Sequence, residues 1–238
     1  MEVVLDAATH VYSNTTTGER YTSVTNFISQ YKKPFDKDFW SKKIAKRDGV
    51  DQQTVLDAWK DITVAAQNRG TNVHLVMERY IKEHYVEPGF EELVDSFVKR
   101  TNTVIKSDSN VLSETVLYSH EHRIAGTADL IVENGDIFHV MDFKTNKKFN
   151  FNSKYNEYFY QPIDYLQQCE FNTYTIQLSI YARLHEMMTG KRCGSLRVFY
   201  LREFQNRFWQ EINCNYMRST VDDLLGDHLK KQVELLVG

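Results

Sequence analysis

The stretch Ser113–Lys148, SETVLYSHEHRIAGTADLIVENGDIFHVMDFKTNKK, decides the fold that we predict for this chain. Its apolar residues alternate in the way typical of three consecutive strands. The pair Asn134–Gly135 stands between two apolar runs, and both residues tolerate the positive φ of a type I′ hairpin turn. We therefore predict a hairpin at this pair, which folds Asp129 back toward Asp142.

The last of these strands, HVMDFK, has two chemically different faces. Because strand side chains repeat every two residues, Asp142 and Lys144 share one face with Val140, whereas Phe143 belongs to the other. Asp129 brings a second carboxylate to this amine. Carboxylate oxygens bind hard divalent cations such as Mg²⁺ or Mn²⁺, and a metal-bound water beside an amine can attack a phosphodiester. The pattern is typical of metal-dependent phosphodiester hydrolysis.

Composition limits the class of protein. The chain has 238 residues, 42% of them hydrophobic, which is enough to bury a core without a stabilising metal or disulfide. We expect one elaborated domain over residues 1–238, with two domains as the alternative. An N-terminal hairpin and helices would occupy residues 1–110, and the core sheet with its helices would occupy residues 111–238.

The cysteines and the hydropathy pattern indicate the compartment. Three widely spaced cysteines have neither disulfide nor metal-site spacing, which favours a reducing environment. No apolar run approaches the ~20 residues that span a bilayer, and the first ten residues lack the features of an export signal. We expect a cytoplasmic protein without a membrane partner; its protein partners are not predicted.

Charge gives a mixed indication. The net charge of −3 lacks the basic footprint of most nucleic-acid-binding domains, but acidic metal ligands lower the total while bound cations do not appear in it. Residues 32–47, KKPFDKDFWSKKIAKR, interleave aromatic side chains with seven basic ones, which suits single-stranded nucleic acid. The helical spacing of Phe39, Trp40 and Ile44 favours the alternative, in which the aromatic rings pack on a core and the lysines face solvent.

Four short motifs follow one another along the chain: RGTNVH (69–74), GTADL (126–130), DFKT (142–145) and QLSIY (177–181). Together they resemble the PD-(D/E)xK nuclease superfamily, in particular its RecB-like branch of phage and mitochondrial exonucleases. Ala128 stands where the family name has proline, and this departure removes no ligand. The resemblance implies an α/β fold with a restriction-endonuclease-like core, in which a central mixed β-sheet is flanked by helices, here with an N-terminal helical elaboration.

The resemblance also implies a metal site. His74, Asp129 and Asp142 would bind Mg²⁺ or Mn²⁺, with the backbone carbonyl of Phe143 as a further ligand. Imidazole nitrogen favours Mn²⁺ more than an all-oxygen site does, although a lone histidine in a helix is usually structural. Lys144 would orient or deprotonate the attacking water and stabilise charge in the transition state.

Further positions are candidates for catalysis or DNA contact. Glu114, in the first core strand, either faces the metal or is an exposed residue of an edge strand. Gln177 and Tyr181 match the Q-x-x-x-Y motif, whose side chains line the groove beside the active centre. Arg69 and Lys147, which lie within or beside the motifs, are expected to contact DNA.

The activity implied by the resemblance is that of a metal-dependent DNA exonuclease acting on ends. Single-stranded or flapped DNA would be the substrate, and 5′-phosphate and 3′-hydroxyl ends the products, in replication, recombination or repair in a bacterial or phage-infected cell. A structure-selective endonuclease and a non-catalytic DNA-binding module are the alternatives. Three cysteines cannot supply the four thiolates of an iron–sulfur cluster, and the sequence has no helicase phosphate-binding loop.

The remaining pattern predicts the elements around this core. Residues 149–172 are polar and aromatic without periodicity, and would form a lid or wall of the DNA groove or a surface loop packed by its own aromatic rings. The other expectations are an N-terminal hairpin around 13–19, a short helix from Ser23 or Thr25 to Gln30, a helix over 51–85 broken or pinched near Gly70, a helix over 90–106, a helix over 174–189 ended by Gly190, strands over 196–201 and 208–213, and a last helix from a capping box at Ser219 to Leu236.

Overall fold

The centre of the molecule is the three-stranded unit that the sequence predicts: β4 (Asn110–Ser119), β5 (Ile124–Asn134) and β6 (Ile137–Lys144). The structure is a computed structural model that describes residues 2–202 and 208–237. β5 pairs antiparallel with β4 and with β6. These pairings bring the middle of β5 beside the end of β6, as the folding of Asp129 toward Asp142 requires.

The hairpin between β5 and β6 turns one residue later than predicted. Asn134 pairs with Ile137, so the two central residues of the turn are Gly135 and Asp136. Gly135 has a φ of +61°, and Asp136 does not share the positive φ that a type I′ turn needs at both positions. The type I′ prediction is therefore wrong, and glycine at the first central position is typical of a type II′ turn.

The sheet extends on both sides of this unit. β7 (Arg192–Tyr200) lies parallel to β6, and β8 (Gln210–Cys214) lies antiparallel to β7. At the other side, β3 (Arg20–Ser23) pairs parallel with β5, and the N-terminal hairpin continues through β2 (Val11–Asn14) to β1 (Val3–Asp6). The mixed eight-stranded sheet with helices around it confirms the predicted α/β fold with a central mixed sheet flanked by helices.

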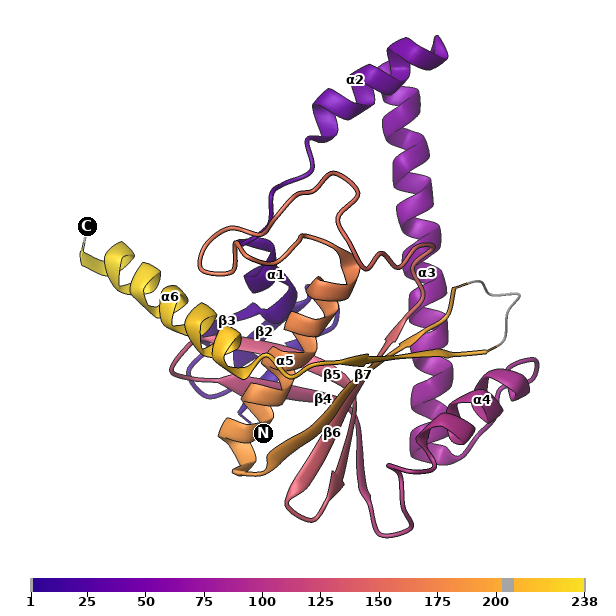
Figure 1. Cartoon of the computed structure of the whole chain (residues 1–238), viewed down its shortest axis with the longest axis vertical. Coiled ribbons are helices and arrows are strands. Elements are labelled where there is room, and N and C mark those ends of the chain that lie inside the picture. The colour runs from indigo at the N-terminus through magenta and orange to yellow at the C-terminus, as the bar shows by residue number, and fades with distance from the viewer. Residues whose placement is uncertain (1, 203–207, 238) are drawn as a thin grey trace.

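Alternating side chains of the strands feed two cores. Val140 belongs to the core that packs against α1 (Val24–Ser29), α5 (Glu170–Thr189) and α6 (Arg218–Val237). Its neighbour Met141 belongs to the core under α3 (Gln52–Glu83) and α4 (Glu91–Thr101). Figure 1 shows these two groups of helices on opposite sides of the sheet. The period of two therefore places the sheet between two helical layers.

Several helix boundaries differ from the predictions. α3 runs through Gly70 without a break over 32 residues, because a single glycine costs only ~1 kcal/mol in a helix whose lower half packs on a core. α4 ends at Thr101, so Val104 is buried outside the helix, and Val98 is exposed. α6 begins at Arg218, so Ser219 lies inside the first turn and does not cap it.

Other boundaries agree with the predictions. Ser23 caps α1 by accepting a hydrogen bond from the Asn26 amide, and Gly190 ends α5 in the left-handed conformation. The three cysteines, all within the described residues, are free thiols, as their spacing predicted. Over residues 2–202 and 208–237, no helix has the length and apolar character that crossing a bilayer requires.

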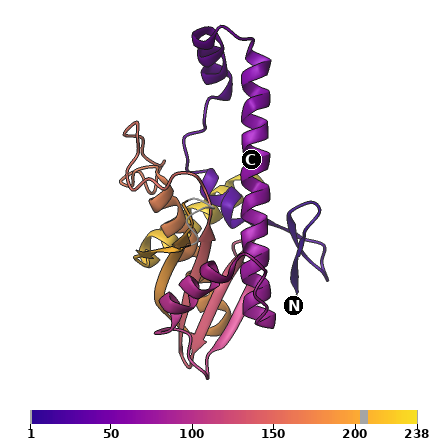
Figure 2. The ribbon, with the colours of Figure 1, turned by 90° about the vertical axis from the view of Figure 1, so that its right-hand side faces the viewer.

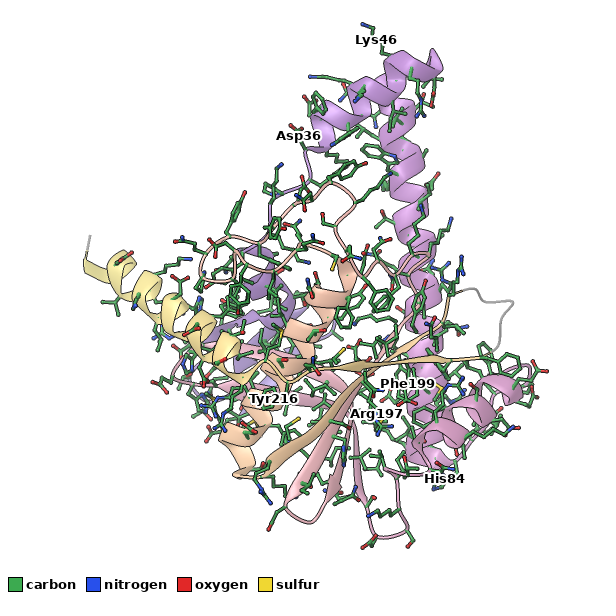
Figure 3. All side chains as sticks on the ribbon, viewed as in Figure 1. Asp36, Lys46, His84, Arg197, Phe199 and Tyr216 are labelled. Carbon is green, nitrogen blue, oxygen red and sulfur yellow. The ribbon has the colours of Figure 1, made fainter. Side chains whose placement is uncertain are left out.

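A helical arm projects from this core. We define the arm as residues 32–68, which comprise the linker after α1, α2 (Lys37–Asp48) and the upper half of α3. Figures 1 and 2 show it standing away from the sheet, and Asp36 and Lys46 mark the two ends of α2 in Figure 3. Phe35 and Phe39 are 65% and 53% exposed. The alternative in which the rings of Phe39 and Trp40 pack on a core is therefore wrong for Phe39.

The segment between β6 and α5 is irregular, as predicted. Its Phe149 ring packs against Tyr174 and Tyr200, whereas Phe159 and Ile163 are buried in the core. Its tyrosines at positions 155, 158, 160 and 165 are exposed. The segment is thus anchored by its own apolar residues while it presents aromatic rings to solvent.

Candidate active site

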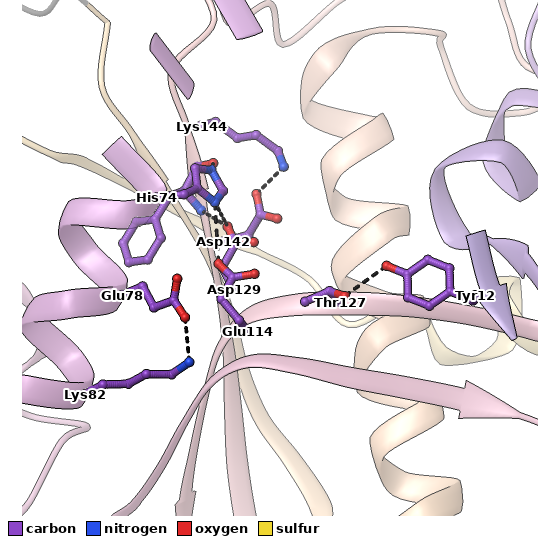
Figure 4. Close-up of polar contacts among 10 residues, drawn as sticks. Tyr12, His74, Glu78, Lys82, Glu114, Thr127, Asp129, Asp142 and Lys144 are labelled. Carbon is purple, nitrogen blue, oxygen red and sulfur yellow. Dashed lines mark hydrogen bonds and ion pairs between the residues drawn. The ribbon is translucent and has the colours of Figure 1, made fainter. Parts of the chain in front are cut away.

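Two carboxylates lie side by side on the neighbouring strands β5 and β6. The pairing of Leu130 with Met141 places Asp129 of β5 beside Asp142 of β6. Both are buried, with 8% and 2% of their surfaces exposed. Asp129 Oδ2 accepts a hydrogen bond of 2.7 Å from the backbone N–H of Phe143, which fixes its orientation. Figure 4 shows His74, Asp129 and Asp142 gathered at one place, with the Asp142 carboxylate turned toward Lys144.

His74 reaches this pair from α3. Its Nε2 lies 3.0 Å from the carbonyl oxygen of Phe143, to which it can donate a hydrogen bond. Its Nδ1 lies 3.6 Å from Asp129 Oδ2 and 3.8 Å from Glu114 Oε1. A donor bond from one ring nitrogen to a backbone carbonyl commonly orients the other nitrogen of a metal-binding histidine. The Phe143 carbonyl, expected as a ligand, is therefore a partner of His74 here.

Glu114 joins the cluster through an unusual backbone conformation. It lies within β4 but has a φ of +50°, a left-handed conformation that costs a non-glycine residue of order 1–3 kcal/mol. The ladder pairs its two neighbours with β5 and omits Glu114 itself. Potential ligand atoms of His74, Glu114 and Asp129 all lie within 4.8 Å of one another. Of the two expectations for Glu114, the structure places it facing the cluster.

Lys144 lies beside the second carboxylate. Its Nζ is 2.5 Å from Asp142 Oδ2 and 4.8 Å from the centre of the Tyr174 ring. The two residues project from the same face of β6, as their spacing predicted. Asp142 is thus paired with the ammonium and is separate from the three-residue cluster of His74, Glu114 and Asp129.

The charges at this site perturb one another. Burial and, after it, the charge of Asp142 raise the pKa of Asp129 to about 7. Burial opposes protonation of His74, but the carboxylates of Asp129, Glu114 and Asp142 together outweigh it and raise its pKa to about 9. Burial likewise opposes the charge of Lys144, but Asp142 and Asp129 raise its pKa. An added positive charge stabilises the ionised form of carboxylates that lie this close together. Carboxylates with one imidazole also form a donor set that divalent cations bind.

A cleft of about 450 Å³ opens onto the site between α3 and the loop after β6. His74 and Lys144 line it together with Tyr174, which the sequence analysis missed. Tyr174 precedes Gln177 by three residues on α5, so the helical period was the signal that could have included it with the Q-x-x-x-Y motif. Burial raises the pKa of Tyr174 to about 12, so its hydroxyl stays protonated near neutral pH.

The four residues predicted to contact DNA lie in different places, and not all of them face the cleft. Arg69 lines the cleft and donates a 2.5 Å hydrogen bond from Nη2 to the carbonyl oxygen of Thr145. Lys147 is exposed on the loop after β6. Gln177 Nε2 donates to the Tyr181 hydroxyl at 3.0 Å, but Tyr181 is buried in the core. The structure thus brings Arg69 to the cleft and gives Tyr181 a packing position.

The glycines of two motifs permit close packing here. A Cβ on Gly126 would lie 2.7 Å from Cε1 of Tyr181 and 2.8 Å from Cγ2 of Val24, closer than real side chains approach. A Cβ on Gly70 would lie 3.4 Å from Oγ1 of Thr145. Glycine at position 126 therefore lets α1 and α5 approach β5.

Comparisons with known proteins give distant structural similarity. No family model matches the chain, and no curated protein matches it. Among solved structures, a candidate exonuclease from Eubacterium rectale is 9% identical, with a TM-score of 0.41 over 91% of this chain and 80% of that one. An alkaline exonuclease from Laribacter hongkongensis is 12% identical, with a TM-score of 0.39 over 91% of each chain. With TM-scores below 0.5, these similarities carry no functional argument, and the site is interpreted from its own geometry.

Proposed function

We propose that this chain is a metal-dependent nuclease that hydrolyses phosphodiester bonds of DNA from the ends of single-stranded or flapped substrates. The observation that carries the proposal is the convergence of His74, Glu114 and Asp129 beside the Asp142–Lys144 pair. This set of groups lies at an open cleft and includes both metal-binding donors and a cation that can face a phosphate.

The donor set supports a divalent cation. His74, Glu114 and Asp129 would hold it, and Asp142 lies close enough to Asp129 to perturb its pKa. When bound, the ion would polarise the phosphodiester and lower the pKa of a coordinated water. Carboxylates suit Mg²⁺, and the imidazole shifts the preference toward Mn²⁺.

Lys144 acts on the phosphate in this proposal. Its ammonium is held 2.5 Å from Asp142 at the end of β6, so its position is fixed before substrate binds. A preorganised cation beside the attacked phosphorus stabilises the negative charge that develops on the phosphoryl oxygens. In the hydrolysis, the water gives up a proton to solvent as its oxygen bonds to phosphorus, the bond from phosphorus to the 3′-oxygen breaks, and that oxygen takes up a proton, which yields a 5′-phosphate and a 3′-hydroxyl.

The cleft surface supports a nucleic-acid substrate. Arg69 and Lys144 contribute positive charge to it, and the Tyr174 ring offers an aromatic surface for a base. These groups read the backbone and the face of a base, which single-stranded DNA presents. They do not form the base-edge contacts that sequence-specific recognition needs.

End-labelled digestion tests this proposal. Single-stranded, flapped, duplex and circular single-stranded DNA are incubated with the protein in Mn²⁺ or Mg²⁺, and the products are resolved by length. We expect the linear single strand to shorten, the circle to survive, and EDTA to stop the reaction. Cleavage of the circle would favour the endonuclease alternative.

Variants decide whether the site does the chemistry. Asp129→Asn and Lys144→Ala are expected to abolish cleavage, whereas Asp95→Asn and Lys99→Ala, exposed residues of α4, are matched controls that should retain it. If no linear substrate is cut under any condition, the chain is a DNA-binding module and the catalytic proposal is wrong.

A further inference from the structure

A continuous series of concave surfaces leads from the active-site cleft onto the arm. The cleft shares Ile62, Thr63 and Gln67 with a groove of about 880 Å³ that runs along α3; we call this the arm groove. The arm groove shares Phe35 and Trp59 with a further hollow of about 810 Å³ beneath α2. The three hollows therefore adjoin one another along α3, and a ligand bound at the active site can continue in this direction.

Exposed apolar side chains line this path. Phe35 is 65% exposed, and its ring lies 5.7 Å from the ring of Trp59 on α3. Ile62, one turn further along α3, is 55% exposed. In the hollow beneath α2, Trp40 lies 6.2 Å from Tyr155 of the irregular segment. Rings gathered along a groove provide a surface on which bases can stack.

The charge of the arm favours an anionic ligand. Residues 32–68 contain eight basic and six acidic side chains, although the whole chain has a net charge of −3. Lys37 and Lys60 line the arm groove, where Asp57 is the acidic neighbour. Exposed lysines beside exposed rings match the phosphates and bases of an unpaired strand.

We propose that the arm groove binds the single strand several nucleotides away from the bond that is cut, with bases stacked on Phe35 and Trp59 and phosphates beside Lys37 and Lys60. This inference rests on the proposed nuclease function, because it takes the active-site cleft as the other end of the same strand. Paired bases keep their faces inside the duplex, so the groove selects single strands over duplex DNA.

The helix itself sets the length of strand that reaches the groove. Trp59 and His74 lie 15 positions apart on α3, and at 1.5 Å per residue the separation along the axis is about 22 Å. A strand stacked at 3.4 Å per nucleotide covers this distance with about six or seven nucleotides. A tetranucleotide at the active site therefore does not reach Trp59, whereas a 20-nucleotide strand does.

Length-dependent binding tests the inference. Fluorescence anisotropy measures binding of 4- and 20-nucleotide oligothymidylates in the Asp129→Asn background, where cleavage does not interfere. We expect Trp59→Ala to weaken binding of the longer strand about fivefold to a hundredfold, the range for loss of one stacked base. Binding of the tetranucleotide should stay within about twofold, and Trp59→Phe should retain most of the affinity because it keeps an aromatic ring.

Controls separate stacking from folding and from catalysis. Tyr85→Ala removes an exposed ring at the opposite end of α3 and should leave binding unchanged, and circular dichroism checks the helix content of each variant. Single-stranded RNA of the same length is expected to lose affinity in parallel, since stacking does not read the sugar. A blunt duplex should compete poorly.

The outcomes for the two proposals can be told apart. If the wild type digests DNA but Trp59→Ala binds and cleaves the 20-nucleotide strand normally, the groove inference is wrong while the nuclease proposal stands. If no variant cleaves DNA but Trp59→Ala still loses affinity for the longer strand alone, the groove binds single strands and the catalytic proposal is wrong.

Discussion

The two halves of α3 differ in how deeply their side chains are buried, although they form one continuous helix. In the lower half, Val73 and Met77 are fully buried under the sheet, and His74 between them is held at a fixed place beside Asp129. In the upper half, Ile62 and Val64 are exposed, and the helix packs against α2 away from the sheet. A ligand-binding residue needs the rigidity that packing gives, whereas a surface for a long flexible strand needs side chains that remain accessible. One continuous helix supplies both and fixes the distance between them.

The largest expected effect on activity comes from the active site beside the lower half of α3. Asp129→Asn keeps the size of the side chain but removes the charge that binds a cation. Loss of such electrostatic stabilisation costs ~10³-fold in rate or more. The observed rate of digestion of a labelled single strand in Mn²⁺ checks this. A variant that retained a tenth or more of the wild-type rate would contradict the assignment of catalysis to the site that Asp129 forms with His74.

Core packing gives the next contrast. Met77→Ala should lower the free energy of unfolding by about 2–5 kcal/mol, because it leaves a cavity in a closed core. Ile62→Ala on the arm should change it by less than about 0.5 kcal/mol, because the side chain is already exposed. Urea titrations of both variants provide the comparison. Equal losses would show that the arm is packed as tightly as the body.

The close packing at Gly126 predicts a smaller loss in the free energy of unfolding. A methyl group there would meet Tyr181 at 2.7 Å and Val24 at 2.8 Å, so Gly126→Ala should cost about 1–3 kcal/mol through overpacking. Gly49→Ala on the arm is not a matched control, because Gly49 has a left-handed φ of +68°. Gly226→Ala in α6 meets no atom within 4 Å and serves that purpose. Unfolding midpoints that fell equally for both alanines would argue against the tight contact.

The smallest expected effect is a pH dependence within the body. Burial lowers the pKa of His185 from its ordinary 6.5, and its Nε2 contacts Glu133 Oε1 at 2.9 Å. Because the unfolded chain then binds a proton more readily than the folded one, this histidine contributes stability that is present above pH 6.5 and lost as the pH falls below it. In EDTA, the decline of the unfolding free energy between pH 7 and 5 should be shallower in His185→Gln than in the wild type. Identical slopes would contradict the lowered pKa.

The sequence predicted the sheet and the lower half of α3 far better than it predicted the arm. Alternation in HVMDFK was enough to place Asp142 and Lys144 on one face, because a strand of period two has no other option. Periodicity also predicted the helix over 51–85, whose Val73 and Met77 are buried. Local pattern is decisive where one face of an element must be buried.

Features set by tertiary contacts were not predictable in this way. The left-handed backbone of Glu114 lies inside a strand whose letters give no turn signal, so its orientation stayed open. The continuity of α3 through Gly70 depends on packing that outweighs the low helix propensity of glycine. The exposure of Phe39 was mispredicted because amphipathic spacing indicates an apolar face but not whether the fold covers it.

Mn²⁺-dependent thermal unfolding tests the central claim most directly, because it measures metal binding at His74, Glu114 and Asp129 without requiring a substrate. A ligand that binds only the folded state stabilises it by about 2.7 kcal/mol at a hundredfold excess over its dissociation constant. We predict that Mn²⁺ raises the unfolding midpoint of the wild type and of Asp95→Asn, that EDTA reverses the rise, and that Asp129→Asn and Glu114→Gln reduce or remove it. An unchanged midpoint in the wild type, or an equal rise in Asp129→Asn, would contradict a metal centre at this site.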